Sequence, residues 1–168
     1  MKRKIIKELD YVWGSVGYII QLSCMIEQNV KMLISGEEVL KELDNIEVSL
    51  LDLIGAINES NRKLKENTEN RVMLGNLVKQ LSGYKLYKNS NLIEDLKKAS
   101  RIRGFYAHEF FKNDLREKHL ENDPLFYKTK LQEDIIFLHE LNITLTSHVE
   151  EYKHLGEELS SSYFGLYN

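Results

Sequence analysis

Apolar positions in the first part of the chain recur every three or four residues, which is the spacing of a buried helical face. This repeat predicts one helix from about Lys2 to Ile34. Gly36 follows directly and is predicted to close the helix, because glycine is favoured just beyond helix C-termini. The positions predicted to share the buried side are Val12, Val16, Ile19, Ile20, Ser23, Ile26, Val30 and Leu33.

Helical spacing resumes after Gly36 and is interrupted again by charged and turn-forming residues. The charged segment is either a solvated helix end or a loop, and the turn-forming segments mark the ends of helices. The predicted order is a second helix over 37–54, the charged segment over 58–70, a short helix over 71–81 and a turn over 84–91.

Two start signals mark the remaining helices. Asn91, with Glu94 three residues later, resembles an N-cap and its reciprocal partner, and the helix it begins is expected to reach about Asn113. Asp123-Pro124 is a capping acid followed by proline at the first helical position, and its helix is expected to end near Leu159. Long helices and short connections predict an all-α protein, built as an antiparallel up-and-down bundle of four to five helices.

Composition sets the class of protein without identifying its chemistry. The 168 residues, 42% of them hydrophobic, suit one domain over 1–160 with a C-terminal tail over 161–168. The net charge of −3 provides no global field that attracts nucleic acid. A single cysteine, Cys24, excludes an intramolecular disulfide framework and fits a reducing compartment. The uncharged run 11–26 is shorter than the roughly 18–20 apolar residues of a membrane span, so we expect a buried helix in a cytoplasmic protein without membrane association.

The segment 101–111, RIRGFYAHEFF, carries the clearest candidate chemistry. Arginine is a fixed cation that matches phosphate geometry, and histidine is the side chain that titrates nearest neutral pH. The positive charge around His108 contrasts with the acidic balance of the whole chain, so a local phosphate site is expected. The residues that concentrate this charge are Lys97, Lys98, Arg101, Arg103 and Lys112.

Helical geometry assigns faces to this segment. With Ile102 at the centre of the buried face, a turn of 100° per residue puts Arg101 and His108 within about 20° of each other and Arg103 on the opposite flank. Gly104 and Ala107 are small enough to let another helix approach closely. The residues predicted to line the buried face or to supply surplus apolar surface are Leu92, Leu96, Ala99, Phe105, Tyr106, Phe110 and Phe111.

Other residues with possible chemistry are less well placed. The four remaining histidines lack the three- or four-residue spacing of a metal pair on one helix face, so we expect no metal site and no cofactor. Trp13 and the many tyrosines are interpreted as core and interface residues rather than platforms for stacking bases. The histidines concerned are His119, His139, His148 and His154.

The segment IRGFYAH, residues 102–108, resembles the signature helix of the HEPN superfamily (higher eukaryotes and prokaryotes nucleotide-binding). Its hallmark is an arginine, four to six residues, then a histidine. Arg103 matches the four-residue spacing and Arg101 the six-residue spacing. Glu27 and the segment 73–81, MLGNLVKQL, also resemble upstream parts of that family.

This resemblance implies a homodimer in which the motif helices of two chains meet and share one Arg/His cleft. The implied activity is metal-independent RNA cleavage of the toxin or phage-defence type, with an antitoxin or a larger defence system as possible partner. The resemblance favours Arg103 as the phosphate-holding residue, whereas helix geometry favours Arg101. The alternatives are a non-catalytic HEPN-like interaction module or a regulator. The implied site comprises Arg103, His108 and Arg101 for catalysis, with Lys97, Lys98, Lys112, Glu109 and Tyr106 for substrate binding.

Overall fold

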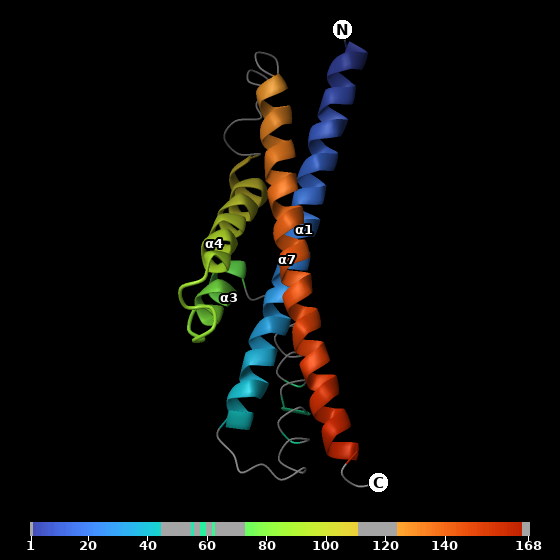
Figure 1. Cartoon of the computed structure of the whole chain (residues 1–168). Coiled ribbons are helices and arrows are strands. Elements are labelled where there is room, and N and C mark those ends of the chain that lie inside the picture. The colour runs from blue at the N-terminus through green and yellow to red at the C-terminus, as the bar shows by residue number, and fades with distance from the viewer. Residues whose placement is uncertain are drawn as a thin grey trace. The chain divides into compact units, whose positions relative to one another are not determined.

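The chain forms a bundle of α-helices. The computed structural model describes residues 2–44, 73–110 and 124–165, together with 55, 58, 59 and 62. Within these residues the helices are α1 (Lys2–Asp44), α3 (Leu74–Leu81), α4 (Asn91–Gly104) and α7 (Pro124–Gly165), and a π-helical turn, η1 (Phe105–Glu109), continues α4 (Figure 1). No strand occurs in the described part. The predicted all-α bundle is therefore confirmed. The separate helix predicted over 37–54 is wrong for residues 37–44, which belong to α1, and lies outside the described residues from residue 45 onward.

The chain divides into two compact units, and both contain parts of the two long helices. Unit 1 comprises Met1–Ile26 and Glu94–Ile143, and unit 2 comprises Glu27–Ile93 and Thr144–Asn168. Within unit 1, α1 and α7 run in the same direction and α4 runs opposite to both (Figure 1). This alternation agrees with the predicted up-and-down arrangement. A single domain ending at residue 160 stays a prediction.

The core of unit 1 is made from the apolar stripe of each helix. The face predicted for α4 and η1 is confirmed for Leu96, Ala99, Ile102, Tyr106 and Phe110, which are at most 9% exposed, whereas Leu92 is half-buried. On α1 the predicted stripe is also buried, apart from Ile20, which is half-buried. The core residues of unit 1 are Val12, Val16, Ile19, Leu22, Ile26, Leu96, Ala99, Ile102, Tyr106, Phe110, Leu131, Leu138 and Leu141.

The first helix does not end at Gly36, and the prediction that glycine closes it is wrong. α1 continues to Asp44, and no described glycine has a positive φ. A Cβ built on Gly36 would lie 2.6 Å from Cδ1 of Tyr152. Glycine is present here because the Tyr152 ring of α7 packs directly on the α1 backbone.

No helix in the described part has a stretch long and apolar enough to cross a bilayer.

Unit 2 contains a helix cap that links distant parts of the sequence. α3 begins at Leu74 with no cap from the preceding Met73 side chain. Instead, the backbone N–H of Leu74 donates to Oε1 of Glu27 at 3.1 Å. A carboxylate is favourable at this end of a helix because unpaired N–H groups give it a partial positive charge. The turn predicted over 84–91 is confirmed for 84–89, where the chain makes successive turns before α4 starts at Asn91.

The last helix begins where the sequence predicts. α7 starts at Pro124, because proline has no N–H to lose at the first helical position. It continues to Gly165, beyond the predicted end near Leu159. α7 thereby contributes Leu138 to the core of unit 1 and Leu145 to that of unit 2.

Candidate functional site

The segment that carries His108 is a π turn. The backbone N–H of Phe110 bonds to the carbonyl of Phe105, five residues earlier, where an α-helix would use the residue four earlier. The sequence predicts a uniform α-helix here, so the turn is a new feature. Such turns are rare and are frequently found at functional sites.

Burial of three side chains explains why the helix widens at this point. Ile102 and Phe110 are eight residues apart, which in a uniform α-helix would put them about 80° apart around the axis. The wider π turn holds one extra residue. Ile102 and Phe110 therefore lie around the axis like α-helical residues that are seven apart, separated by about 20°. Ile102, Tyr106 and Phe110 can therefore all face the core, and each is at most 9% exposed.

Aromatic side chains pack against one another around the turn. The ring centroids of Tyr106 and Phe110 are 4.9 Å apart, and those of Phe105 and Phe110 are 5.7 Å apart. Tyr127 of α7 meets Phe110 edge-on, with centroids 6.2 Å apart. Edge-to-face and tilted pairs at these separations are favourable beyond their apolar burial. The π turn is thus supported by packing as well as by its backbone hydrogen bond.

Tyr106 is a core residue, which corrects its predicted role in substrate binding. Its side chain is 1% exposed, and its hydroxyl donates to Oδ2 of Asp134 at 2.8 Å. Burial, followed by the bond to Asp134 and the charge of that carboxylate, raises the pKa of Tyr106 well above its usual value. The Nζ atom of Lys130 lies 3.4 Å from the same oxygen of Asp134. Tyr106 therefore positions the π turn on α7 and does not reach a ligand at the surface.

The basic residues of α4 divide between two sides of the helix. Lys97 pairs with Glu94 at 2.7 Å. This hydrogen bond, the charge of Lys97 and the charge of Arg101 lower the pKa of Glu94, which indicates that Lys97 and Arg101 follow one outer stripe. Lys98 instead lies over the ring of Phe137 on α7, 3.8 Å from its centroid. We call Lys97 and Arg101 the cationic stripe.

The predicted catalytic residues differ in exposure. Arg101 and His108 are exposed, whereas Arg103 is half-buried. Glu109 is exposed beside His108. Lys112, predicted to bind substrate, lies outside the described residues, as does Phe111.

The π turn also changes which arginine His108 faces. In a uniform α-helix Arg103 and His108, five residues apart, would lie about 140° apart around the axis. In a π turn each residue rotates less around the helix axis than in an α-helix. This lag in rotation adds up to about 100° by the end of a turn that holds one extra residue. The lag moves His108 toward the Arg103 flank and away from the Arg101 flank. The predicted 20° separation of Arg101 and His108 therefore does not hold.

Two of the histidines on α7 lie close to a glutamate on the same helix. His148 and Glu151 approach to 3.4 Å, and His154 and Glu157 to 3.7 Å, each pair on one side of α7. Among the described residues no group of three histidine, cysteine, aspartate or glutamate side chains could hold a metal ion. Cys24 is an exposed, free cysteine.

Comparison of the chain with protein-family models, with curated proteins and with solved structures gives no match.

Proposed function

We propose that this protein is a HEPN-like endoribonuclease that acts as a dimer and cleaves RNA without a metal ion. The observation that carries the proposal is the exposed His108 within the η1 π turn, on the flank that the lag turns toward Arg103. This observation removes the geometric reason for preferring Arg101. Arg103, the residue that the resemblance favours, is accordingly our choice for holding the phosphate.

The chemistry of this proposal uses the RNA itself as nucleophile. The ribose 2′-OH attacks the adjacent phosphorus, and the bond between phosphorus and the 5′-oxygen breaks. His108 would take the 2′-OH proton or give a proton to the departing 5′-oxygen, and two copies in a dimer would supply both functions. Arg103 would stabilise the charge that develops on the non-bridging oxygens. The products carry a 2′,3′-cyclic phosphate and a 5′-hydroxyl, and DNA is spared because it lacks the nucleophile.

The surrounding residues suit a polyanion. The cationic stripe, Lys97 and Arg101, is exposed on the flank of α4 from which His108 is turned away, so these cations would contact phosphates farther along the RNA and not the scissile one. A Cβ built on Gly104 meets nothing within 4 Å, so this position offers room for a second motif helix. A two-fold symmetric contact at this position would place the arginine and histidine of a second chain next to those of the first, so that the same residues serve the site twice. The cytoplasmic setting and the toxin or phage-defence partner belong to the same proposal.

The test is cleavage of total RNA by purified protein in excess EDTA. We expect His108→Ala to lose about 10²–10⁴-fold in rate, the usual effect of removing a general acid or base. His139→Ala is the matched control, because His139 is an exposed histidine of α7. Arg103→Ala should lose more activity than Arg101→Ala, with circular dichroism as the folding control.

Three outcomes would contradict the proposal. Equal cutting of DNA would exclude the 2′-OH as nucleophile. Full activity of His108→Ala would assign the cleavage to another site or to a contaminant. A folded dimer that cuts no RNA would favour the non-catalytic interaction module.

A further inference from the structure

Asp134 is a carboxylate in the apolar interior of unit 1. The residue is 8% exposed, and Leu131 and Leu138, about one turn to either side of it on α7, are fully buried. A buried charge lowers stability unless it is paired and hydrogen-bonded, and an apolar residue of similar size at the same place is often no less stable. Asp134 is therefore expected to have a role other than filling the core.

Two donors from different elements meet one oxygen of Asp134. The Tyr106 hydroxyl of η1 donates to Oδ2 at 2.8 Å. The Nζ atom of Lys130, one turn earlier on α7, lies 3.4 Å from the same oxygen, and the side chain of Lys130 is 43% exposed. Lys130 therefore balances the charge of the carboxylate from the solvent side, whereas Tyr106 connects the carboxylate to η1.

His108 lies between two buried side chains of the π turn. Tyr106, two residues before it, and Phe110, two residues after it, are each 1% exposed. The rings of Phe105 and Phe110 are in contact, with centroids 5.7 Å apart, although residues five apart in an α-helix lie about 140° apart around the axis. Apolar burial is not directional, whereas a hydrogen bond weakens steeply as its angle closes. The bond from Tyr106 to Asp134 therefore opposes rotation of η1 more sharply than burial alone.

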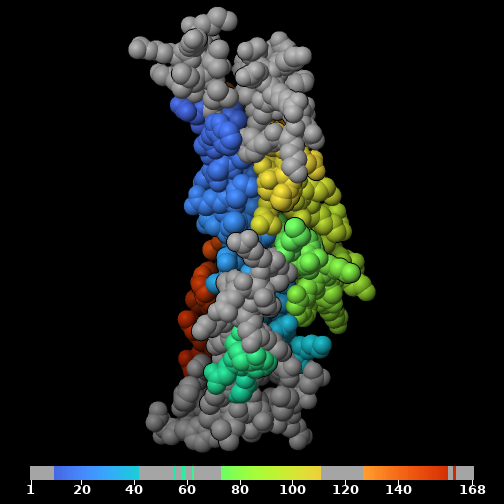
Figure 2. Space-filling model, turned by 180° about the vertical axis from the view of Figure 1, so that it is seen from behind, coloured from blue at the N-terminus to red at the C-terminus, as the bar shows by residue number. Residues whose placement is uncertain are grey.

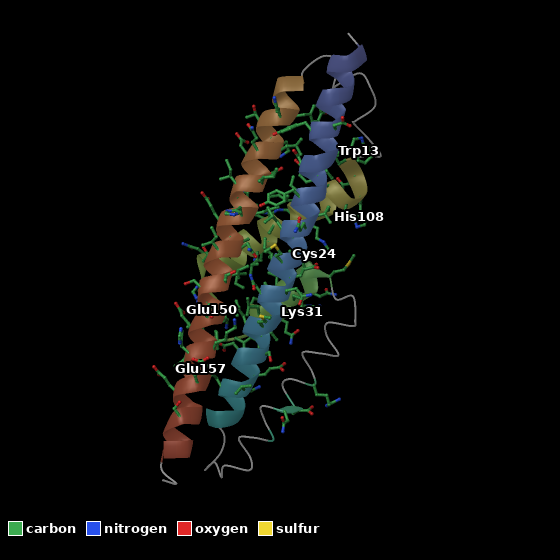
Figure 3. All side chains as sticks on the ribbon, turned by 90° about the vertical axis from the view of Figure 1, so that its right-hand side faces the viewer. Trp13, Cys24, Lys31, His108, Glu150 and Glu157 are labelled. Atoms are coloured by element: carbon green, nitrogen blue, oxygen red, sulfur yellow. The ribbon has the colours of Figure 1, made fainter. Side chains whose placement is uncertain are left out.

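The carboxylate of Asp134 and the ring of His108 lie on different sides of η1. Figure 3 shows His108 on the side of the α4–η1 segment that faces away from α7, the helix that carries Asp134. Figure 2 shows the corresponding face of unit 1, where the end of α4 and η1 (yellow) lie at the surface beside the unit 1 part of α1 (blue). An effect of Asp134 on a substrate at His108 must therefore pass through Tyr106.

We infer that Asp134 is a positioning residue for His108. Its hydrogen bond with the Tyr106 hydroxyl holds η1 at the angle that presents His108 on the Arg103 flank, where the proposed reaction needs it. This inference rests on the proposed function. A buried polar group can act in this way by selecting one arrangement of the chain, even where it adds little to overall stability.

The test compares variants that differ in this hydrogen bond. Tyr106→Phe removes the hydroxyl and keeps the ring, Asp134→Leu removes the acceptor, and Asp134→Asn keeps an acceptor oxygen without the charge. We expect Tyr106→Phe and Asp134→Leu to lower kcat for RNA cleavage by about 10–100-fold, since a misplacement of about 1 Å can cost about 10²-fold in rate. KM should change little, because the cations that contact phosphate are unchanged. Asp134→Asn should recover most of the rate.

Tyr152→Phe is the matched control. The Tyr152 hydroxyl also donates to a carboxylate, that of Glu37, but both residues belong to unit 2. The substitution removes the same kind of hydrogen bond outside the site, so it should lower Tm and leave kcat unchanged. Circular dichroism verifies that each variant is folded.

A second readout needs no cleavage. The NMR signal of the His108 ring, identified by its absence in His108→Ala, reports the surroundings of the imidazole. We expect this signal to shift in Tyr106→Phe and Asp134→Leu and to return close to its original position in Asp134→Asn. It should stay unchanged in Tyr152→Phe.

The outcomes separate this inference from the proposed function. If the unchanged protein cleaves RNA but folded Tyr106→Phe leaves the His108 signal where it was, Asp134 has no positioning role and the nuclease stands. If no RNA is cleaved but the His108 signal follows the expected pattern, the positioning of His108 is supported and the nuclease is not. Equal losses of kcat in Asp134→Asn and Asp134→Leu would also refute the inference, because the acceptor oxygen would then make no difference.

Discussion

Glycines within α1 provide a test in which one substitution should have opposite effects at different positions. Replacing an interior helical glycine by alanine ordinarily stabilises a protein by about 0.5–1 kcal/mol. At Gly36 the added Cβ would lie 2.6 Å from Cδ1 and 3.0 Å from Cγ of Tyr152. The ring cannot easily move, because its hydroxyl donates to Glu37 and is 3.2 Å from the hydroxyl of Tyr87. Overpacking of this kind costs about 1–3 kcal/mol.

The net expectation for Gly36→Ala is a loss of about 1–2 kcal/mol in the free energy of unfolding. This corresponds to a decrease of about 2–8 °C in Tm for a protein of this size. Gly17→Ala is the matched control, because nothing lies within 4 Å of its added Cβ, and it should gain stability. Urea unfolding followed by circular dichroism measures both.

A double substitution isolates the cause. In a Tyr152→Ala background the collision is absent, so Gly36→Ala should become stabilising. If Gly36→Ala raises the stability of the otherwise unchanged protein, or costs the same in both backgrounds, the packing explanation is wrong.

Two further predictions concern assembly and pH. Light scattering should give a mass near twice 19.7 kDa, and a monomer at micromolar concentration would exclude the shared cleft. Gly104→Ala should weaken this dimer and leave the fold intact, because the added Cβ enters open space in the single chain. Because the folded-state pKa of Tyr106 is raised above the ordinary value of 10.0, its contribution to stability is present below pH 10 and is lost as pH rises further. Tyr106→Phe should therefore lessen the alkaline loss of stability in urea titrations from pH 8 to 11, and an unchanged slope would contradict the assigned burial.

Local sequence determined most of the helical arrangement, because the positions of buried residues depend on helical period alone. Ala99, Ile102, Tyr106 and Phe110 were identified as one face from their spacing, and all are buried. Pro124 marked the start of α7 because its effect on the backbone is local. Such features need no information about distant residues.

The features that the sequence did not predict depend on partners far along the chain. Gly36 has the same local context whether it ends a helix or accommodates Tyr152, which lies on another helix. The cap of α3 is a glutamate on α1, and no signal near Leu74 indicates it. The π turn arises from aromatic packing that includes Tyr127. For the candidate site, the residue types were predictable, but their exposure and their angles around the helix were not.

The π turn of η1 also affects how sequences related to this one should be aligned. A helix with such a turn holds one residue more than an α-helix that presents the same faces. A relative one residue shorter between Gly104 and Phe110 would keep its buried face in register, with the equivalents of Ile102 and Phe110 seven positions apart. A gap placed inside this helix would then be structurally correct, although gaps inside helices are normally avoided. The number of residues between arginine and histidine is accordingly a poor guide to whether two such chains share one site.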